Sequence, residues 1–144
     1  MAGRRFVQQW QRFRALDGAG RWLIIEAVTL MVIIQAGFRM LSYAMLRRGL
    51  DNLKALRAGS RHSPSRIGWA VNAAGRRLPG RTCLSEALAA DVMLCRHGYS
   101  PIVRLGIRKT DGRRAMPEAH AWVECGGKIV TGELSMLDDY KLLH

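Results

Sequence analysis

The first long apolar stretch of the chain covers residues 21–46 and reads RWLIIEAVTLMVIIQAGFRMLSYAML. At about 100° per residue, Arg21, Gln35 and Arg39 fall on one side of a helix and apolar residues cover the rest. This pattern predicts one or two helices packed into protein or resting on a membrane face. A bilayer span is disfavoured because Glu26 and Arg39 bracket only twelve residues, whereas a span needs about 20.

Two breaks are predicted in this half of the chain. Gly37 favours a bend, and the run RRG at residues 47–49 favours a helix end, because cations suit the C-terminal dipole and glycine suits the residue after it. Residues 58–64, AGSRHSP, form a polar connector. We therefore expect an N-terminal helical region at residues 1–57 and a second domain at residues 64–144.

Shorter elements are predicted beyond the connector. Residues 67–74 favour a short helix, and residues 83–96 favour a longer one with apolar positions at helical spacing. Thr82 is a suitable N-cap, and Gly98 follows the last turn. Cys83 is therefore the expected first residue of this helix.

Three strands complete the predicted fold. Apolar positions alternate in residues 101–108, and residues 119–125 and 128–133 flank Gly126 and Gly127, which favours a hairpin. The predicted class is α+β: N-terminal apolar helices followed by a small core in which a helix packs on an antiparallel sheet. A two-residue turn would pair Cys125 with Lys128, Glu124 with Ile129, Trp122 with Thr131 and His120 with Glu133.

Composition narrows the class of protein. The chain has 144 residues, of which 49% are hydrophobic and 24% charged, so it suits one compact domain and excludes a disordered or collagen-like protein. Its net charge of +12 favours anionic partners. Nucleic acid is not expected among them, because the basic residues are scattered in pairs without interleaved aromatic residues.

Cysteine usage and the N-terminus indicate a compartment. Three cysteines without a C-x-x-C motif or paired His/Cys spacing predict neither a disulfide framework nor a metal site. Residues 1–10 are basic and lead into polar residues, without the apolar run of a secretory signal. We expect a cytoplasmic protein without a cofactor, with peripheral contact to a membrane as an option for the N-terminal helices.

The candidate chemistry depends on a thiol and an imidazole. A thiol attacks as thiolate, and the first turn of a helix favours that form, which distinguishes Cys83 from Cys95 in mid-helix and Cys125 at a strand end. Its base would be His120, oriented by Glu133 across the hairpin. The backbone N–H of Cys83 is a candidate oxyanion donor. Asp138 and Asp139 are alternatives to Glu133, and they also suit a helix or turn start.

The other histidines and two of the tryptophans have simpler roles. His62, His97 and His144 are expected to be solvated or to cap elements. Trp69 and Trp122 are expected in the core or in the wall of a substrate cleft.

The residues TCLSEALAADVMLCRHGYSPIVRLGIRK and EAHAWVECGGKIVTGE resemble the transglutaminase-like cysteine-protease domain of the lasso-peptide biosynthesis B proteins, which are leader peptidases. The resemblance covers residues 64–144, and the apolar helical prefix is similar as well. It implies Cys83 as nucleophile and His120 as base. The third member of the triad is usually Asp in that family, whereas this chain has Thr131, Gly132 and Glu133 in the same stretch.

The resemblance also implies a reaction and partners. It implies removal of the leader from a ribosomally made precursor peptide, together with a small leader-recognition protein and a ring-closing synthetase. Two alternatives from other classes remain: a transglutaminase-like acyltransferase that passes the same thioester to an amine, and a non-catalytic basic adaptor whose partners follow from the net charge.

Overall fold

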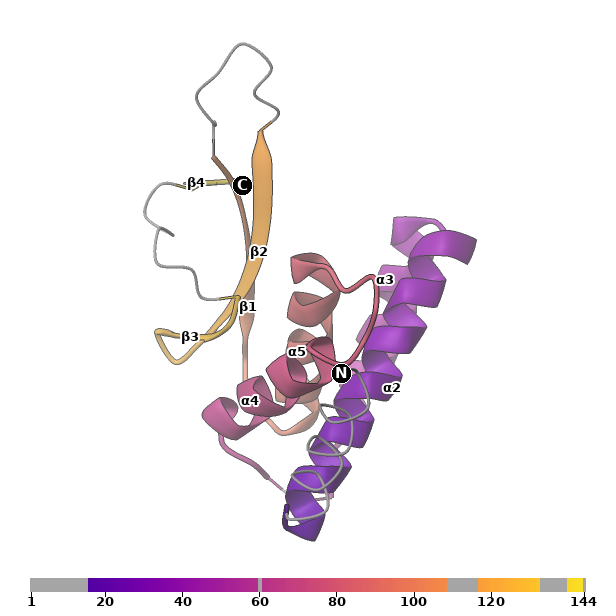
Figure 1. Cartoon of the computed structure of the whole chain (residues 1–144), viewed down its shortest axis with the longest axis vertical. Helices are drawn as coiled ribbons and strands as arrows, with labels where there is room; N and C mark the ends of the chain where they lie inside the picture. Colours follow the sequence, from indigo (N-terminus) through magenta and orange to yellow (C-terminus); the bar gives the residue numbers. More distant parts are fainter. Residues whose placement is uncertain (1–15, 60, 109–116, 133–139, 144) are drawn as a thin grey trace, which may run out of the picture.

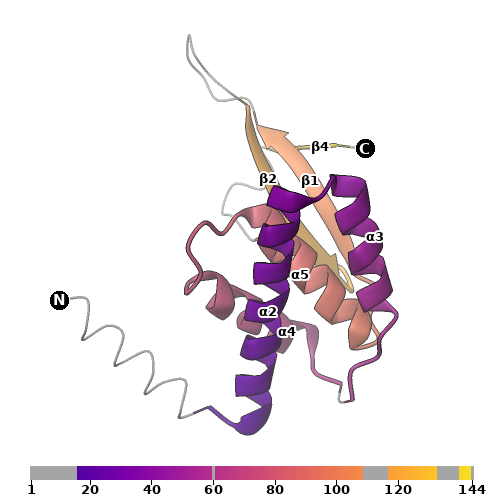
Figure 2. The ribbon, with the colours of Figure 1, turned by 90° about the vertical axis from the view of Figure 1, so that its right-hand side faces the viewer.

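A computed structural model describes residues 16–59, 61–108, 117–132 and 140–143. The described elements are, in order, α2 (Gly18–Met40), α3 (Tyr43–Lys54), α4 (Pro64–Gly75), α5 (Cys83–Arg96), β1 (Ile102–Arg108), β2 (Glu118–Cys125), β3 (Lys128–Thr131) and β4 (Lys141–Leu142). The helices lie on one side of the sheet (Figure 1). From that side, α2 and α3 form the near layer, with the sheet behind (Figure 2). The predicted α+β class, with an apolar N-terminal helix, is confirmed.

The break between α2 and α3 falls later than predicted. The bend expected at Gly37 is wrong, because α2 runs unbroken to Met40 and Gly37 is buried inside it. A Cβ on Gly37 would lie 2.5 Å from Leu46 Cδ1, so this glycine makes room for α3 to pack closely. The chain turns at Leu41, and the Ser42 hydroxyl then caps α3 by accepting a hydrogen bond from the Met45 N–H at 3.4 Å.

The helix end predicted at residues 47–49 is also wrong. α3 continues through Gly49 to Lys54. Leu46 and Leu50 are one turn apart and both are buried, so packing of this face outweighs the weak helix propensity of a glycine.

Both predicted helices beyond the connector are confirmed, but the connector begins before residue 58 and Pro64 already belongs to the first of these helices. Residues 55–63 join α3 to α4, and the Ser63 hydroxyl caps α4 by accepting a hydrogen bond from the Arg66 N–H at 3.3 Å. Thr82 caps α5, whose first residue is Cys83 as predicted. The start of α5 is thus defined by local hydrogen bonds.

The sheet has the strand order β3-β2-β1-β4, and every pairing is antiparallel. Gly126 and Gly127 form the predicted hairpin turn, with φ of 60° and 76°. The pairs Cys125 with Lys128 and Glu124 with Ile129 are confirmed.

The next predicted pair of the hairpin is wrong. Thr131 lies opposite Val123 and not opposite Trp122, because the register shifts between Val123 and Glu124. Val130 is the extra residue of this β-bulge, and a bulge changes which side chains face each other further along the ladder. The argument that placed Glu133 opposite His120 required an unbroken ladder, and Glu133 itself lies outside the described residues.

One hydrophobic cluster joins the N-terminal helices to the rest of the protein. It takes Leu23, Met31 and Leu50 from α2 and α3, and Leu88 and Val123 from α5 and β2. The division into residues 1–57 and 64–144 stays a prediction, and the two parts share this core.

The first described helix is long and apolar enough to cross a membrane by length and composition alone. One of its faces, which includes Ala27 and Ile34, is buried against α4 and α5. Glu26 on the same helix forms an ion pair with Arg96 at the end of α5. This face of α2 therefore belongs to the protein core.

Candidate functional site

Cys83 lies at the positively polarised end of α5. The Thr82 hydroxyl accepts a hydrogen bond from the Ser85 N–H at 3.1 Å, and the Ser85 hydroxyl accepts one from the Thr82 N–H at 3.0 Å. This reciprocal cap holds the first turn in place. The half-buried Cys83 side chain opens into a pocket of about 260 Å³ that Arg81, Thr82 and Glu86 also line.

Arg81 and Glu86 form the polar rim of this pocket. Arg81 Nη1 donates to Glu86 Oε1 at 2.9 Å. The Glu86 carboxylate also lies against Gly75 at the end of α4, where a Cβ would collide with it. Arg81 thus balances the acidic side chain in the first turn of α5, so the positive potential of the helix start is retained beside Cys83.

The other two cysteines have different surroundings. Cys95 is four residues after Asp91 on the same helix, with its Sγ 4.0 Å from Asp91 Oδ1. Burial raises the pKa of the Cys95 thiol, and the Asp91 charge adds to the rise, so this cysteine stays protonated at neutral pH. Cys125 ends β2 and packs against the core.

His120 lies near the beginning of β2. Its Nε2 is 2.6 Å from the carbonyl oxygen of Gly132, so the tautomer that donates there leaves the Nδ1 lone pair available as a base. The ring stacks against Trp122 at a centroid distance of 6.2 Å. The orienting acceptor of His120 in the described structure is therefore a backbone carbonyl.

Strand alternation sends the side chains of β2 to two faces. Ala121 and Val123 enter the core that α5 also joins, whereas His120 and Trp122 face the other side. His120 is not among the residues that line the Cys83 pocket.

Tyr140 is a neighbour of His120. Its ring centroid is 5.7 Å from that of His120. Burial raises the pKa of the Tyr140 phenol, and the negative charge of Glu118 adds to the rise. The Tyr140 ring therefore lies beside the imidazole of His120.

The sequence did not reveal the group around Tyr140. Arg108 Nη2 donates to Glu118 Oε2 at 2.6 Å, and the Arg108 guanidinium lies 5.4 Å from the centre of the Tyr140 ring. The hydrogen bond from Arg108 lowers the pKa of Glu118. Gly106 lets Tyr140 approach, because a Cβ there would lie 2.9 Å from Tyr140 Cβ. From the sequence, strand alternation indicates only that Glu118, two residues before His120, lies on the same face of the strand as His120.

The remaining predicted site residues lie as follows. Trp122 is buried and donates through Nε1 to Glu124 Oε1 at 2.9 Å, whereas Trp69 on α4 is 40% exposed. The Cys83 N–H is at the first position of α5, where helix geometry provides no partner. Asp138, Asp139, Glu133 and His144 lie outside the described residues.

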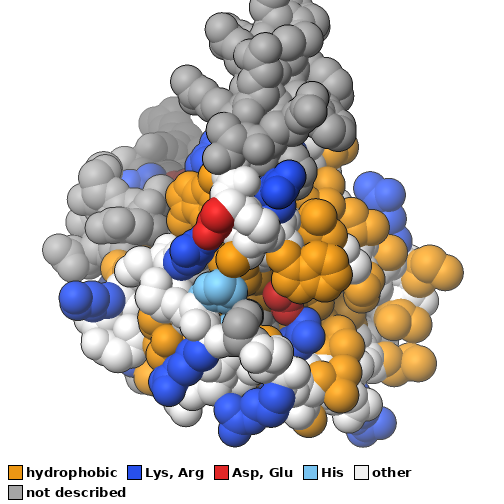
Figure 3. Space-filling model, turned by 90° about the horizontal axis from the view of Figure 1, so that it is seen from below, with side chains coloured by type: hydrophobic (Ala, Val, Ile, Leu, Met, Phe, Trp, Pro, Cys, Tyr) orange, Lys and Arg blue, Asp and Glu red, His pale blue; other side chains and the backbone are white. Residues whose placement is uncertain are grey.

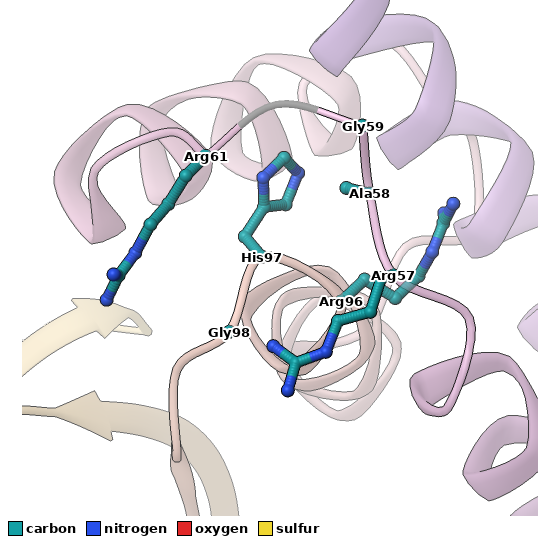
Figure 4. Close-up of a pocket in the computed structure, with 7 residues that line it drawn as sticks. All are labelled: Arg57, Ala58, Gly59, Arg61, Arg96, His97 and Gly98. Carbon is teal, nitrogen blue, oxygen red and sulfur yellow. The ribbon is translucent and has the colours of Figure 1, made fainter.

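A second pocket, of about 280 Å³, lies at the other end of α5 (Figure 4). His97 caps the helix there and is buried, and its Nδ1 accepts a hydrogen bond from the His62 N–H at 3.4 Å. The expected capping role of His97 is confirmed. Arg96 points to Glu26 on α2, while Arg61 points away and lies over the Tyr99 ring. Arg96 and Arg61 therefore point to different partners.

A family model for the transglutaminase-like superfamily matches residues 28–144. The chain therefore belongs to the transglutaminase-like superfamily, whose chemistry is of the cysteine protease or acyltransferase type. No curated protein and no solved structure matches the chain.

Proposed function

We propose that the protein is a cysteine peptidase that removes the leader from a ribosomally made lasso-peptide precursor. The observation that carries this proposal is Cys83, half-buried at the capped start of α5, in a chain that belongs to the transglutaminase-like superfamily. The lasso-peptide substrate follows from the resemblance of residues 64–144 to the B proteins of that pathway.

The proposed reaction has two halves. The Cys83 thiolate attacks the carbonyl carbon of the peptide bond after the leader, and the Cys83 N–H stabilises the oxyanion. His120, which has taken the thiol proton, returns it to the departing amine of the core peptide. Water then attacks the thioester while His120 accepts its proton, which frees the leader carboxylate and restores the thiol. The reaction requires the His120 imidazole to reach Cys83 when substrate is bound.

The proposal includes partners. A small leader-recognition protein would present the precursor, and a ring-closing synthetase would consume the released core peptide. The same thioester passed to an amine would instead make the protein an acyltransferase, and family membership supports that chemistry as a second candidate.

A cleavage assay tests the proposal. The full chain is incubated with a precursor peptide and its recognition protein, and products are read by intact mass. Cys83→Ala should reduce the cleavage rate at least about 1,000-fold. The matched control Cys95→Ala should stay within about twofold, since the pKa of Cys95 is raised and it lies away from the helix start. Equal rates for Cys83→Ala and wild type would contradict a thiol mechanism, and joining of the acyl group to an added amine would identify an acyltransferase.

A second measurement tests the role of His120. The rate of alkylation of Cys83 by iodoacetamide is followed against pH in wild type and in His120→Ala, both in the Cys95→Ala, Cys125→Ala background. An imidazolium partner stabilises the thiolate, so the wild-type rate should persist to lower pH than that of His120→Ala. Identical profiles would remove His120 from the mechanism and leave Cys83 to another base.

A further inference from the structure

The outward side of α2 and α3 carries a large set of exposed apolar residues. We name it the outer α2–α3 face, and it consists of Trp22, Ile25, Val32, Ile33, Met40, Leu41, Tyr43 and Met45. Seen from below, apolar side chains gather on the side of the molecule where α2 and α3 lie, with Lys and Arg side chains around them (Figure 3). Large apolar side chains gathered on one exposed face of a folded domain are typical of an interaction surface.

The face is organised along α2 as a stripe. At about 100° per residue, positions 22, 25, 29, 32, 33, 36 and 40 fall within an arc of roughly 100°. Arg21 and Arg39 lie together at one edge of this arc, about 27 Å apart along the axis. Aromatic residues stand near its two ends, Trp22 at the start and Tyr43 just past the break. Amphipathic aromatic rings and long cationic side chains at the edge are typical of helices that lie in a lipid interface.

The outer α2–α3 face contains an apolar groove. Between the second half of α2 and α3 lies an apolar pocket of about 520 Å³, lined by residues that include Ile33, Met40, Met45 and Leu53. It opens on the outer α2–α3 face, because Ile33, Met40 and Met45 belong to both. Such a groove can accept part of an acyl chain.

The charged residues around the outer α2–α3 face indicate which kind of partner it binds. The described acidic residues of this region are all paired: Asp17 with Arg66, Glu26 with Arg96, and Asp51 with Arg47 and Lys54. Within the described ranges, Arg21, Arg39 and Arg48 have no carboxylate within ion-pair distance. The sequence of residues 1–15, directly before this region, adds four arginines and no acidic residue. The whole chain carries +12. The complement of an apolar face with this border is an anionic lipid surface.

We propose that the outer α2–α3 face binds the surface of an anionic lipid bilayer, with α2 lying parallel to the membrane plane. α2 does not cross the bilayer in this arrangement, because its other face is part of the core and its Glu26 is paired with Arg96. Trp22, Val32 and Ile33 enter the acyl boundary, while Arg21 and Arg39 reach lipid phosphates. The proposal does not depend on the peptidase reaction.

Vesicle flotation of the full chain tests the lipid surface. Binding is compared between phosphatidylcholine vesicles and vesicles with about 30% phosphatidylglycerol. We expect at least tenfold stronger binding to the anionic vesicles, and a marked loss as salt rises from about 0.1 M to about 0.5 M. No binding to either vesicle, or equal binding to both, would overturn the proposal.

Matched variants test which face binds. Val32→Gln with Ile33→Gln should lower vesicle affinity at least tenfold, whereas Ile102→Gln, at a residue as exposed on β1, should leave it unchanged. Arg21→Gln with Arg39→Gln should lower it about 30-fold, at roughly fivefold per arginine. The control Arg57→Gln with Arg76→Gln, at exposed sites elsewhere, should have a much smaller effect. Wild-type binding by the Val32 and Ile33 variant, with an unchanged circular dichroism spectrum, would contradict the assignment.

Two further results separate this proposal from others. Cys83→Ala should float like wild type, so failure of the peptidase assay and failure of membrane binding are distinguishable. Light scattering without vesicles reports a second copy: a dimer that Val32→Gln with Ile33→Gln abolishes, in a protein that does not float, would assign the face to self-association and overturn the lipid proposal.

Discussion

Single residues in this protein take their chemistry from their place in an element. Cys83 and Cys95 are twelve positions apart in the sequence on one helix. The first stands where backbone N–H groups point outward, while the second is packed beside Asp91, and burial raises its pKa. Asp17 also lies at the start of a helix. Its carboxylate caps α2 by accepting a hydrogen bond from the Gly20 N–H, and it accepts another from Arg66 at 2.5 Å.

The pKa of Asp17 predicts a pH dependence of stability. The hydrogen bond from Arg66, and then that from Gly20, lowers this pKa from its ordinary 3.8. A carboxyl with a lower pKa in the folded state stabilises the fold above its unfolded pKa, and this contribution is lost as pH falls through the folded value. Asp17→Asn, which keeps a capping oxygen, should therefore reduce the free energy of unfolding at pH 7.

Urea unfolding at several pH values measures the effect. The difference between Asp17→Asn and wild type should shrink as pH falls below 3.8. The control Asp51→Asn changes a carboxylate that is 54% exposed and paired with Arg47 and Lys54 on the same helix, and it should alter the free energy of unfolding little at pH 7. A difference for Asp17→Asn that is constant from neutral pH to pH 2 would contradict the assigned charge effect.

At the scale of elements, the packing of helices against their neighbours determines structure where the helix propensity of single residues does not. Gly49 would end a helix by propensity, yet α3 continues because Leu46 and Leu50 are buried. Gly68 on α4 has the opposite role, since a Cβ there would meet the carbonyl oxygen of Val130 on β3. One glycine is tolerated, and the other is required by packing.

The two glycines give a matched pair of variants. Gly68→Ala should lower the free energy of unfolding by about 1–3 kcal/mol, because α4 must move away from β3. Gly49→Ala should raise it by about 0.5–1 kcal/mol, because no atom lies within 4 Å of the added Cβ and alanine is the better helix former. Chemical unfolding checks both values. Equal effects of the two substitutions would show that the contact of Gly68 with Val130 does not carry stability.

At the scale of the molecule, helices from the first half cover the elements that carry the candidate site. α2 packs against α4 and α5, and Glu26 reaches Arg96 at the far end of α5. Residues such as Ile67 and Leu88 are buried in this shared core. Without α2 and α3, the faces of α4 and α5 that pack against these helices would be exposed to water.

A cut in the connector tests this dependence. A fragment of residues 58–144 expressed alone should show no cooperative unfolding transition, because its helices lose the cover of α2 and α3. Co-expressed with residues 1–57, it should co-purify and regain the transition measured by circular dichroism. A fragment 58–144 that unfolds cooperatively with the stability of the full chain would show that the first helices are dispensable for folding.

Sequence and structure agree best where the cause is local. Thr82 and Ser85 cap α5 through their own hydroxyls, and two glycines with positive φ turn the hairpin, so the start at Cys83 and the first two strand pairs were predictable. Periodicity placed α4 and β1 for the same reason. These caps, turns and periodic patterns involve only residues that are close together in the sequence.

Contacts between distant segments could not be predicted in this way. The bulge at Val130 depends on how β3 meets β2 and α4, and it removes the register that would have placed Glu133 opposite His120. Tyr140 joins His120 because β4 pairs with β1 across more than thirty residues, and Gly106 leaves space for its ring. Burial and register are properties of two surfaces together. The hydrophobic pattern of one segment shows which of its faces is buried. Which other segment packs against that face is determined only when the whole core is assembled.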